Sequence, residues 1–294
     1  MSLVEKALKK LQDSHGAGDA VVEPIRPDVV IGAGTGAVAM SDRQIVIDHA
    51  ALRRAGLLAP EGHERRLAAE YRQIKRPLLA AALGKGEAPL PNGRLIMMAS
   101  ALPGEGKTFS SLNVAVSMAL EKDITVVLVD ADVAKPHISR TFGVAEEPGL
   151  LDVLRDESRD IESAIIPTSI RGLSILPAGS HIETATELLA SARMDRIMTQ
   201  LGGGGTNRIF LFDSPPLLLT AESRVLAGIM GQVVVVVRAE STLRRAVFEA
   251  LECIPDGKPL RLILNQSESA PANVYYGYGD YYGHSAAPPE NPEK

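Results

Sequence analysis

The segment that most constrains this chain is Ala101-Leu-Pro-Gly-Glu-Gly-Lys-Thr108, which directly follows the apolar run of residues 95–99. An apolar strand, a glycine-bearing loop, Lys-Thr and a helix-like segment over residues 110–120 form the pattern of a phosphate-binding loop. In such a loop, backbone N–H groups and the helix N-terminus hold phosphates, the lysine reaches the outer phosphates, and the threonine hydroxyl can bind Mg²⁺. Ala101 stands where the first glycine is usual. The segment predicts a bound nucleoside triphosphate, with an ordinary strand-to-helix turn as the alternative.

Length and charge narrow the class of protein. The 294 residues give room for one α/β domain of about 200 residues with extra segments at its ends. The net charge of −5 argues against a nucleic-acid partner, because binding many phosphates needs a basic surface. Cys253 is the only cysteine, which fits a reducing compartment. Neither a membrane-spanning run nor a signal peptide is recognisable, so we expect a cytoplasmic protein.

The segments before the loop predict an extension in two parts. Residues 1–44 combine an amphipathic helix (1–12), suited to docking on a protein or more weakly on a membrane, with a Gly- and Pro-rich linker. The glycines within residues 29–37 resemble a dinucleotide fingerprint, but the helix and the acidic residue that it requires are missing. Residues 45–93 predict a helical arm, with a short strand at 45–48 and a helix at 62–83 that Pro77 kinks or breaks. The helix carries basic residues, which indicate either a solvated face or a contact with an acidic neighbouring protomer: Arg65, Arg66, Arg72, Lys75 and Arg76.

A regular alternation begins at residue 94 and predicts the core, residues 94–265. Helix-like segments at about 107–121, 184–201, 220–230 and 241–253 separate nearly continuous apolar runs, as a sheet buried on both faces requires. The fold class predicted is therefore α/β, a P-loop NTPase with a doubly wound, mainly parallel sheet. The predicted strands are residues 95–99, 124–129, 173–176, 208–212, 233–237 and 260–264.

Residues 266–294, called the tail here, are polar, contain Gly, Pro and Ser, and predict a flexible segment. Burial of an apolar face does not explain why most of the protein's tyrosines gather there. The tail holds five of the six tyrosines: Tyr275, Tyr276, Tyr278, Tyr281 and Tyr282.

Acidic residues follow two of the predicted strands, at the sheet edge where ligands bind in open α/β folds. Asp130 and Asp132 follow the run at 124–129, and Asp213 follows the run at 208–212. Carboxylates beside a phosphate loop suit Mg²⁺, which prefers oxygen ligands and keeps several waters. Phosphoryl transfer needs such charge neutralisation and positioning. Whether the acceptor is water or a hydroxyl stays open from these residues alone.

Four motifs together resemble the bacterial tyrosine kinase (BY-kinase) family. They are residues 100–108, Val129-Asp-Ala-Asp-Val-Ala-Lys-Pro136, Phe212-Asp-Ser-Pro-Pro216 and the tyrosine cluster, in family order over roughly residues 94–282. The first three correspond to the family's Walker A, Walker A′ and Walker B elements. Residues 1–8 and 71–79 are similar to the stand-alone autokinases of exosortase and exopolysaccharide loci.

The resemblance implies an ATP- and Mg²⁺-dependent kinase that phosphorylates its own tail tyrosines in trans and regulates exopolysaccharide polymerisation or export. It implies catalytic roles for Lys107, Asp130 and Asp132, with the division between the two aspartates open, and metal contacts for Thr108, Asp132 and Asp213. Partners implied are a membrane-embedded chain-length determinant as activator, further copies of the chain, and a cognate tyrosine phosphatase, so that the protein lies at the inner face of the plasma membrane. The ATP contacts implied are Pro103, Gly104, Glu105, Gly106, Lys107, Thr108, Phe109 and Asn265.

Two positions depart from the family pattern, and one position separates the alternatives. Ala134 stands where a basic residue is usual, and Ala69 replaces the acidic member of an oligomerisation motif that continues with Arg72 and Lys75. The alternative is a switch ATPase resembling the MinD/ParA partition proteins, which hydrolyses ATP without phosphorylating tyrosine. Those proteins carry a lysine where this chain has Leu102, and they lack a tyrosine-rich tail.

Overall fold

The described strands form one mainly parallel sheet. The computed structural model describes residues 44–58, 61–85, 90–203 and 207–267, all within the second of two units, Met1–Asp42 and Arg43–Lys294. Its seven strands lie in the order β3-β4-β2-β5-β1-β6-β7, parallel throughout except that β3 runs antiparallel to β4. The predicted doubly wound sheet is thus confirmed. The strands are β1 (Leu95–Ser100), β2 (Thr125–Asp130), β3 (Ile166–Pro167), β4 (Leu173–Leu176), β5 (Arg208–Asp213), β6 (Gln232–Arg238) and β7 (Leu260–Asn265).

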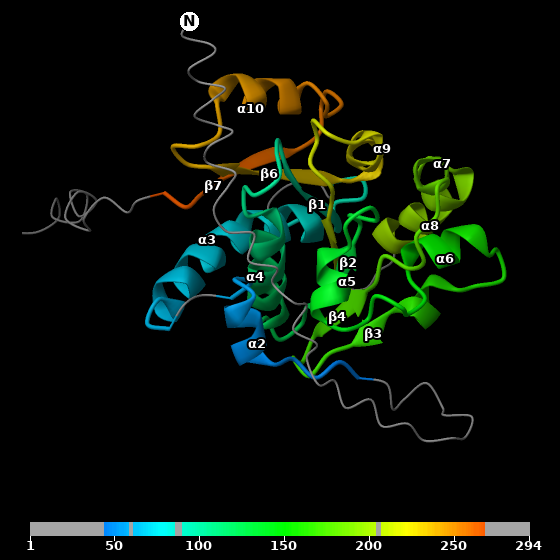
Figure 1. Ribbon diagram of the computed structural model, residues 1–294, viewed down its shortest axis with the longest axis horizontal. Helices are drawn as coiled ribbons and strands as arrows, with labels where there is room; N and C mark the ends of the chain where they lie inside the picture. Colours follow the sequence, from blue (N-terminus) through cyan, green and yellow to red (C-terminus); the bar gives the residue numbers. More distant parts are fainter. Residues whose placement is uncertain (1–43, 59–60, 86–89, 204–206, 268–294) are drawn as a thin grey trace, which may run out of the picture. The chain divides into compact units, whose positions relative to one another are not determined.

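Helices cover both faces of the sheet (Figure 1). One face packs against α2 (His49–Arg54), α3 (Glu64–Leu83), α4 (Lys107–Ala119) and α5 (His137–Thr141). The other face packs against α6 (Leu150–Arg155), the 3₁₀ helix η1 (Ile161–Ala164), α7 (Ala185–Leu189), α8 (Ala192–Gly203), α9 (Ala221–Ile229) and α10 (Arg244–Leu251).

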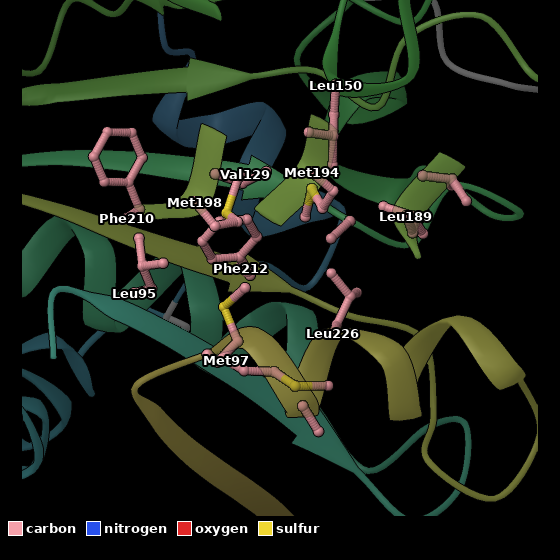
Figure 2. Packing of buried hydrophobic residues seen from close by; sticks show 14 of the residues in the cluster. Leu95, Met97, Val129, Leu150, Leu189, Met194, Met198, Phe210, Phe212 and Leu226 are labelled. Atoms are coloured by element: carbon pink, nitrogen blue, oxygen red, sulfur yellow. The ribbon is translucent and has the colours of Figure 1, made fainter. Parts of the chain in front are cut away.

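The central strands are buried on both faces because their residues alternate between two hydrophobic clusters. In β1, Leu95, Met97 and Ala99 contact the cluster on the α8 and α9 side, while Ile96 and Met98 contact the α3 and α4 side. All five are fully buried, as expected for a parallel sheet covered by helices. Figure 2 shows the first cluster, where the strand side chains Phe210, Phe212 and Met97 meet side chains from α6 to α9.

Several predicted elements have different boundaries. The strand predicted at 45–48 is wrong, because only Ile45 forms an isolated bridge, to Thr168. The helix predicted at 184–201 is interrupted between α7 and α8, where the Ser191 hydroxyl accepts a hydrogen bond from Met194 N at 3.2 Å and so begins a new helix. Pro77 does not break α3, which continues to Leu83. Five short elements had no sequence prediction of their own: α2, α5, α6, η1 and β3.

Helix α3 packs on α4, the helix that follows the phosphate loop. Tyr71 and Leu78 of α3 are buried in the same cluster as the apolar face of α4. Lys75, predicted on an exposed basic face, is only 5% exposed, and its Nζ donates to the Ser117 carbonyl and pairs with Glu121 Oε1 at 2.9 Å. The ammonium thus caps the C-terminal end of α4, where helix carbonyls lack partners. The helix predicted at 1–12 and the tail from residue 268 onward lie outside the described residues. No helix of the described residues is long and apolar enough to cross a membrane.

Candidate active site

The loop between β1 and α4 has the backbone geometry of an anion-binding turn. Gly104 and Gly106 have φ values of 79° and 87°, in the left-handed region that favours glycine. Gly106 is the N-cap of α4, and no side chain caps this helix end. The first N–H groups of α4 therefore keep their capacity to bind an anion, aided by the helix dipole.

The loop is held from within and from the end of β7. The buried Glu105 carboxylate accepts hydrogen bonds from Leu102 N at 2.8 Å and from the Thr242 hydroxyl. Asn265 Nδ2 donates to the Glu105 carbonyl at 2.9 Å. A Cβ at Gly106 would lie 2.0 Å from Asn265 Nδ2, so glycine there also permits this contact. Asn265, expected near the adenine, holds the loop backbone in this structure.

Asp213, at the carboxyl end of β5, is contacted by three hydrogen-bond donors from α4. Lys107 Nζ lies 2.8 Å from Asp213 Oδ1, and the Thr108 hydroxyl donates to Oδ2 at 2.8 Å. The Ser111 hydroxyl lies 2.8 Å from Oδ1 and 2.9 Å from the Lys107 carbonyl. Asp213 is fully buried and the Lys107 side chain is 9% exposed, so the pair is desolvated and its charges are balanced. Ser111 had no sequence prediction, although its position one turn after Lys107 puts both on one helix face.

Asp130 is equally buried, but no cation of the described residues pairs with it. It lies opposite Asp213 in the ladder between β2 and β5. Its Oδ2 accepts from Ser139 N and from the Ser139 hydroxyl, both at 2.7 Å, while its Oδ1 has no partner among the described residues. Burial raises the pKa of Asp130 to about 7, against the effect of the Ser139 hydrogen bonds. Ser139 lies in α5 and had no sequence prediction.

Asp132 is the more accessible of the two aspartates after β2. It is half-buried, and its Oδ1 accepts from Lys135 N at 3.2 Å. Burial raises the pKa of Asp132, while the charge of Lys107 opposes the rise. The structure therefore brings Lys107, Thr108 and all three predicted aspartates to one edge of the sheet.

The remaining predicted site residues are placed less closely. Pro103 and Gly104 are exposed at the tip of the loop. Phe109 is half-buried and packs its ring against Tyr71, with centroids 6.4 Å apart, so that in this structure it joins α4 to α3. The five tail tyrosines lie outside the described residues.

The donors at this edge fit a hard cation. The Thr108 hydroxyl gives its proton to Asp213, which leaves its lone pairs available for a metal ion, and the unpartnered Oδ1 of Asp130 adds an oxygen nearby. Among the described residues, no group of three or more His, Cys, Asp and Glu side chains is arranged to hold a metal ion. A cation here would therefore take further ligands from water and phosphate, as Mg²⁺ commonly does.

A mainly parallel sheet with a phosphate loop after an inner strand, β1, and with carboxylates at the ends of β5 and β2 on the same side of it, defines a P-loop NTPase. Residues 93–247 match the family described as AAA domain, and the chain belongs to that family.

The relatives with curated names include tyrosine kinases. The chain is 30% identical over 191 residues to the putative tyrosine-protein kinase EpsB of Ralstonia nicotianae, covering 64% of this chain but only 25% of that protein. It is 29% identical over 212 residues to the tyrosine-protein kinase YwqD of Bacillus subtilis, covering 71% of this chain and 85% of that protein. It is also 30% identical over 209 residues to the succinoglycan biosynthesis transport protein ExoP of Rhizobium meliloti, covering 64% of this chain and 25% of that protein.

A solved kinase domain has the same fold. The kinase domain of VpsO superposes with a TM-score of 0.58 and 28% sequence identity, covering 71% of this chain and all of that domain. The resemblance to bacterial tyrosine kinases is thus confirmed by sequence and by structure.

Proposed function

We propose that this chain is an ATP-dependent protein-tyrosine kinase that phosphorylates the tyrosines of its own tail, on a neighbouring copy. The observation that carries the proposal is the Lys107, Thr108 and Asp213 arrangement beside the phosphate loop, in a chain whose relatives are named tyrosine-protein kinases.

The loop supplies the phosphate site. Backbone N–H groups from Gly104 to Thr108 bind the phosphates, and Lys107 neutralises the outer ones. In the structure the Lys107 ammonium is buried and paired with Asp213 at the start of α4. The charge is therefore already in place when a nucleotide arrives, which reduces the reorganisation that the transfer requires.

Thr108, Asp132 and Asp213 are the residues that would hold Mg²⁺, directly or through water. When bound, the ion supplies charge neutralisation for the transferred phosphoryl group. The fully buried Asp213 also orients the Thr108 oxygen through its 2.8 Å hydrogen bond.

The acceptor proton needs a carboxylate that the tyrosine can reach. The terminal phosphoryl group moves from the bridging oxygen of ATP to the tyrosine oxygen, the tyrosine proton goes to an aspartate, and ADP leaves. Asp132 is half-exposed and has a raised pKa, which suits a general base. Asp130 is fully buried, and this favours Asp132 for contact with the acceptor, with Asp130 behind it.

The proposed setting is exopolysaccharide production. One relative is named a succinoglycan biosynthesis transport protein, which supports a role beside a membrane-embedded chain-length determinant as activator, with a tyrosine phosphatase reversing the modification. Each phosphate adds about −1.5 to −2 charges. Phosphorylation of neighbouring tyrosines then loosens oligomers of an already acidic chain.

In this proposal, self-association through the arm uses fewer charged residues than the family's oligomerisation motif contains. Arg72 is exposed and free to contact a neighbour, whereas Lys75 is buried and engaged with α4. With Ala69 in the acidic position, Arg72 is the remaining charged member of the motif that faces solvent.

The test is intact-protein mass after incubation with ATP and Mg²⁺. Wild type gains phosphates, Lys107→Met gains none, and the variant with all five tail tyrosines changed to Phe gains none but still hydrolyses ATP. Mixing Lys107→Met as acceptor with the five-Phe variant as enzyme then isolates transfer between copies, and the acceptor gains phosphate.

Two outcomes contradict the proposal. If wild type hydrolyses ATP without gaining mass, the switch ATPase is the better description. If wild type is phosphorylated but the mixed sample is not, the kinase assignment stands and transfer in trans is wrong.

A further inference from the structure

Strand β7 presents an apolar surface to solvent at the end of the sheet. Leu260, Leu262 and Leu264, called the edge strip here, are 40%, 56% and 62% exposed. Phe248 of α10 beside them is 58% exposed, and Leu264 and Phe248 line a cavity of about 250 Å³ next to β7. The core residues of the central strands are fully buried by comparison. A contiguous apolar patch rimmed by polar residues marks a contact surface.

The backbone of the edge strip is open as well. Val233 N donates to the Pro259 carbonyl and Ala239 N donates to the Asn265 carbonyl, so the odd-numbered residues of this stretch point their polar groups at β6. In a ladder the alternate residues point the other way. The N–H and C=O groups of the edge strip therefore face outward, and among the described residues no strand pairs with that edge. Such an edge is a template for one more strand.

The chain itself supplies a segment that fits this edge. Gln266, directly after β7, has a φ of 56°, so the backbone turns where the strand ends. Pro271 follows, a residue suited to a connection rather than to a paired strand. Next come Val274, Tyr276 and Tyr278, β-formers at alternate positions whose side chains share one face of an extended segment.

We propose that the unphosphorylated tail folds back as an antiparallel strand along β7, with Val274 opposite Leu264, Tyr276 opposite Leu262 and Tyr278 opposite Leu260. This single register covers all three exposed leucines and uses residues 266–273 as the connection. Directly opposite side chains of antiparallel strands lie on the same face and pack, and aromatic residues on aliphatic ones are favourable pairs. The outward backbone groups of the edge strip gain partners at the same time.

The docked strand divides the tail tyrosines into two classes. Tyr276 and Tyr278 pack on leucine, whereas Tyr275 lies on the opposite face and Tyr281 and Tyr282 lie beyond the paired residues. Under the proposed kinase function, on which this step alone rests, phosphates on Tyr276 or Tyr278 place charge against the edge strip and release the tail. The docked strand is then the form of the tail that precedes phosphorylation.

Hydrogen exchange on the full-length, phosphatase-treated chain without ATP tests the docking. The variant Tyr276→Asp with Tyr278→Asp removes the leucine-facing side chains. The matched control, Tyr275→Asp with Tyr281→Asp, adds the same charge at positions that do not face the leucines. We expect the first variant to speed exchange at the amides of the edge strip at least tenfold and the control to change it less than twofold. Amides facing β6 stay protected in both and report an intact sheet.

Three outcomes overturn the docking: wild-type amides of the edge strip that exchange without protection, equal effects of both variants, or protection that rises with protein concentration. The last result assigns the edge to a second copy of the chain. Because no ATP is present, a failure here is separate from a failure of the kinase assay.

A cross-link checks the register. In a Cys253→Ser background, Leu262→Cys with Tyr276→Cys should form an intrachain disulfide, since Cα atoms of such opposite residues lie about 5.5 Å apart. Leu262→Cys with Tyr275→Cys, one residue out of register, should form it at least tenfold more slowly. Equal rates for the two pairs overturn the register.

Discussion

The ends of β2 and β5 hold two carboxylates that share their burial and differ in their neighbours. Asp130 and Asp213 are both fully buried and face each other in the sheet. Asp213 contacts the Lys107 ammonium and two hydroxyls of α4. Asp130 has only Ser139 as donor, and one of its oxygens has no partner in the described part of the chain.

The difference shows what balances a carboxylate removed from water. A cation in direct contact offsets the loss of hydration of the charged form, whereas neutral donors offset it only in part. Consistently, burial raises the pKa of Asp130 to about 7 despite its two hydrogen bonds of 2.7 Å. The end of β5 thus holds a carboxylate in direct contact with a cation, and the end of β2 is a site where a proton can be held near neutral pH.

The largest expected effect comes from removing the charge at the end of β5. Asp213→Asn leaves Lys107 buried without its counter-charge, and loss of one partner from a buried pair costs about 3–5 kcal/mol of unfolding free energy. Denaturant unfolding at pH 7 without nucleotide measures this loss. In the kinase assay the same variant should lose Mg²⁺-dependent phosphate incorporation by roughly 100-fold or more.

Asp130→Asn is the matched control at the end of β2. Asparagine resembles the protonated acid and does not titrate, whereas at pH 7 wild type loses stability because the unfolded chain ionises Asp130 more readily than the folded chain does. The unfolding free energy of Asp130→Asn should therefore not fall but rise, by up to about 4 kcal/mol. Equal losses in the two variants would remove the contrast between the two strand ends.

The second expected effect is a pH dependence that belongs to Asp130. Its pKa rises from 3.8 in the unfolded chain to about 7 in the folded chain. Between these values the folded chain binds a proton that the unfolded chain does not, so the unfolding free energy falls as the pH rises. From pH 5 to pH 8 the contribution of Asp130 falls by about 2.5 kcal/mol.

Unfolding curves of wild type and Asp130→Asn at pH 5 and pH 8, in EDTA, measure this contribution. Other titrating groups act in both proteins, so the change in their difference isolates Asp130. We expect the unfolding free energy of Asp130→Asn, measured relative to that of wild type at the same pH, to be lower at pH 5 than at pH 8. A difference that is the same at both pH values contradicts the raised pKa.

Local patterns were sufficient to predict the scaffold of the site. The strands that contain Met97, Phe212 and Val235 are continuous apolar runs. Such runs predict strands buried on both faces without information from the rest of the chain. Asp130 and Asp213 end two of those runs, and carboxyl ends of parallel strands share one edge. The convergence of the aspartates with Lys107 thus followed from the fold class alone.

The partners that set the chemistry could not be predicted in this way. The Thr242 hydroxyl meets Glu105 across 137 residues, and Ser139 meets Asp130 from a helix of five residues, His137–Thr141, too short for periodicity to show. Lys75 sits among basic residues that suggest a solvated face, yet it is buried against α4. Such contacts depend on how separate elements pack, and the spacing of residues along the chain carries no information about that packing.

The smallest expected effects come from removing two serine hydroxyls, each of which donates to one of the two carboxylates. These variants compare the ends of β5 and β2 most directly. Ser111→Ala removes a hydroxyl 2.8 Å from Asp213. A hydrogen bond to a charged group contributes about 1.5–3 kcal/mol, and we expect the unfolding free energy to fall by about that amount.

Ser139→Ala removes the hydroxyl that donates to Asp130 at 2.7 Å and that accepts from Ala178 N at 3.1 Å. At pH 5 Asp130 is protonated, so the loss should be about 1 kcal/mol, that of an ordinary hydrogen bond. At pH 8 the ionised form loses a donor that stabilised it, so the loss should be larger and the pKa of Asp130 should move further up. Denaturant unfolding of both alanine variants at both pH values measures the four losses. A loss for Ser139→Ala that is the same at both pH values would contradict the assignment of a titrating proton to Asp130 at the end of β2.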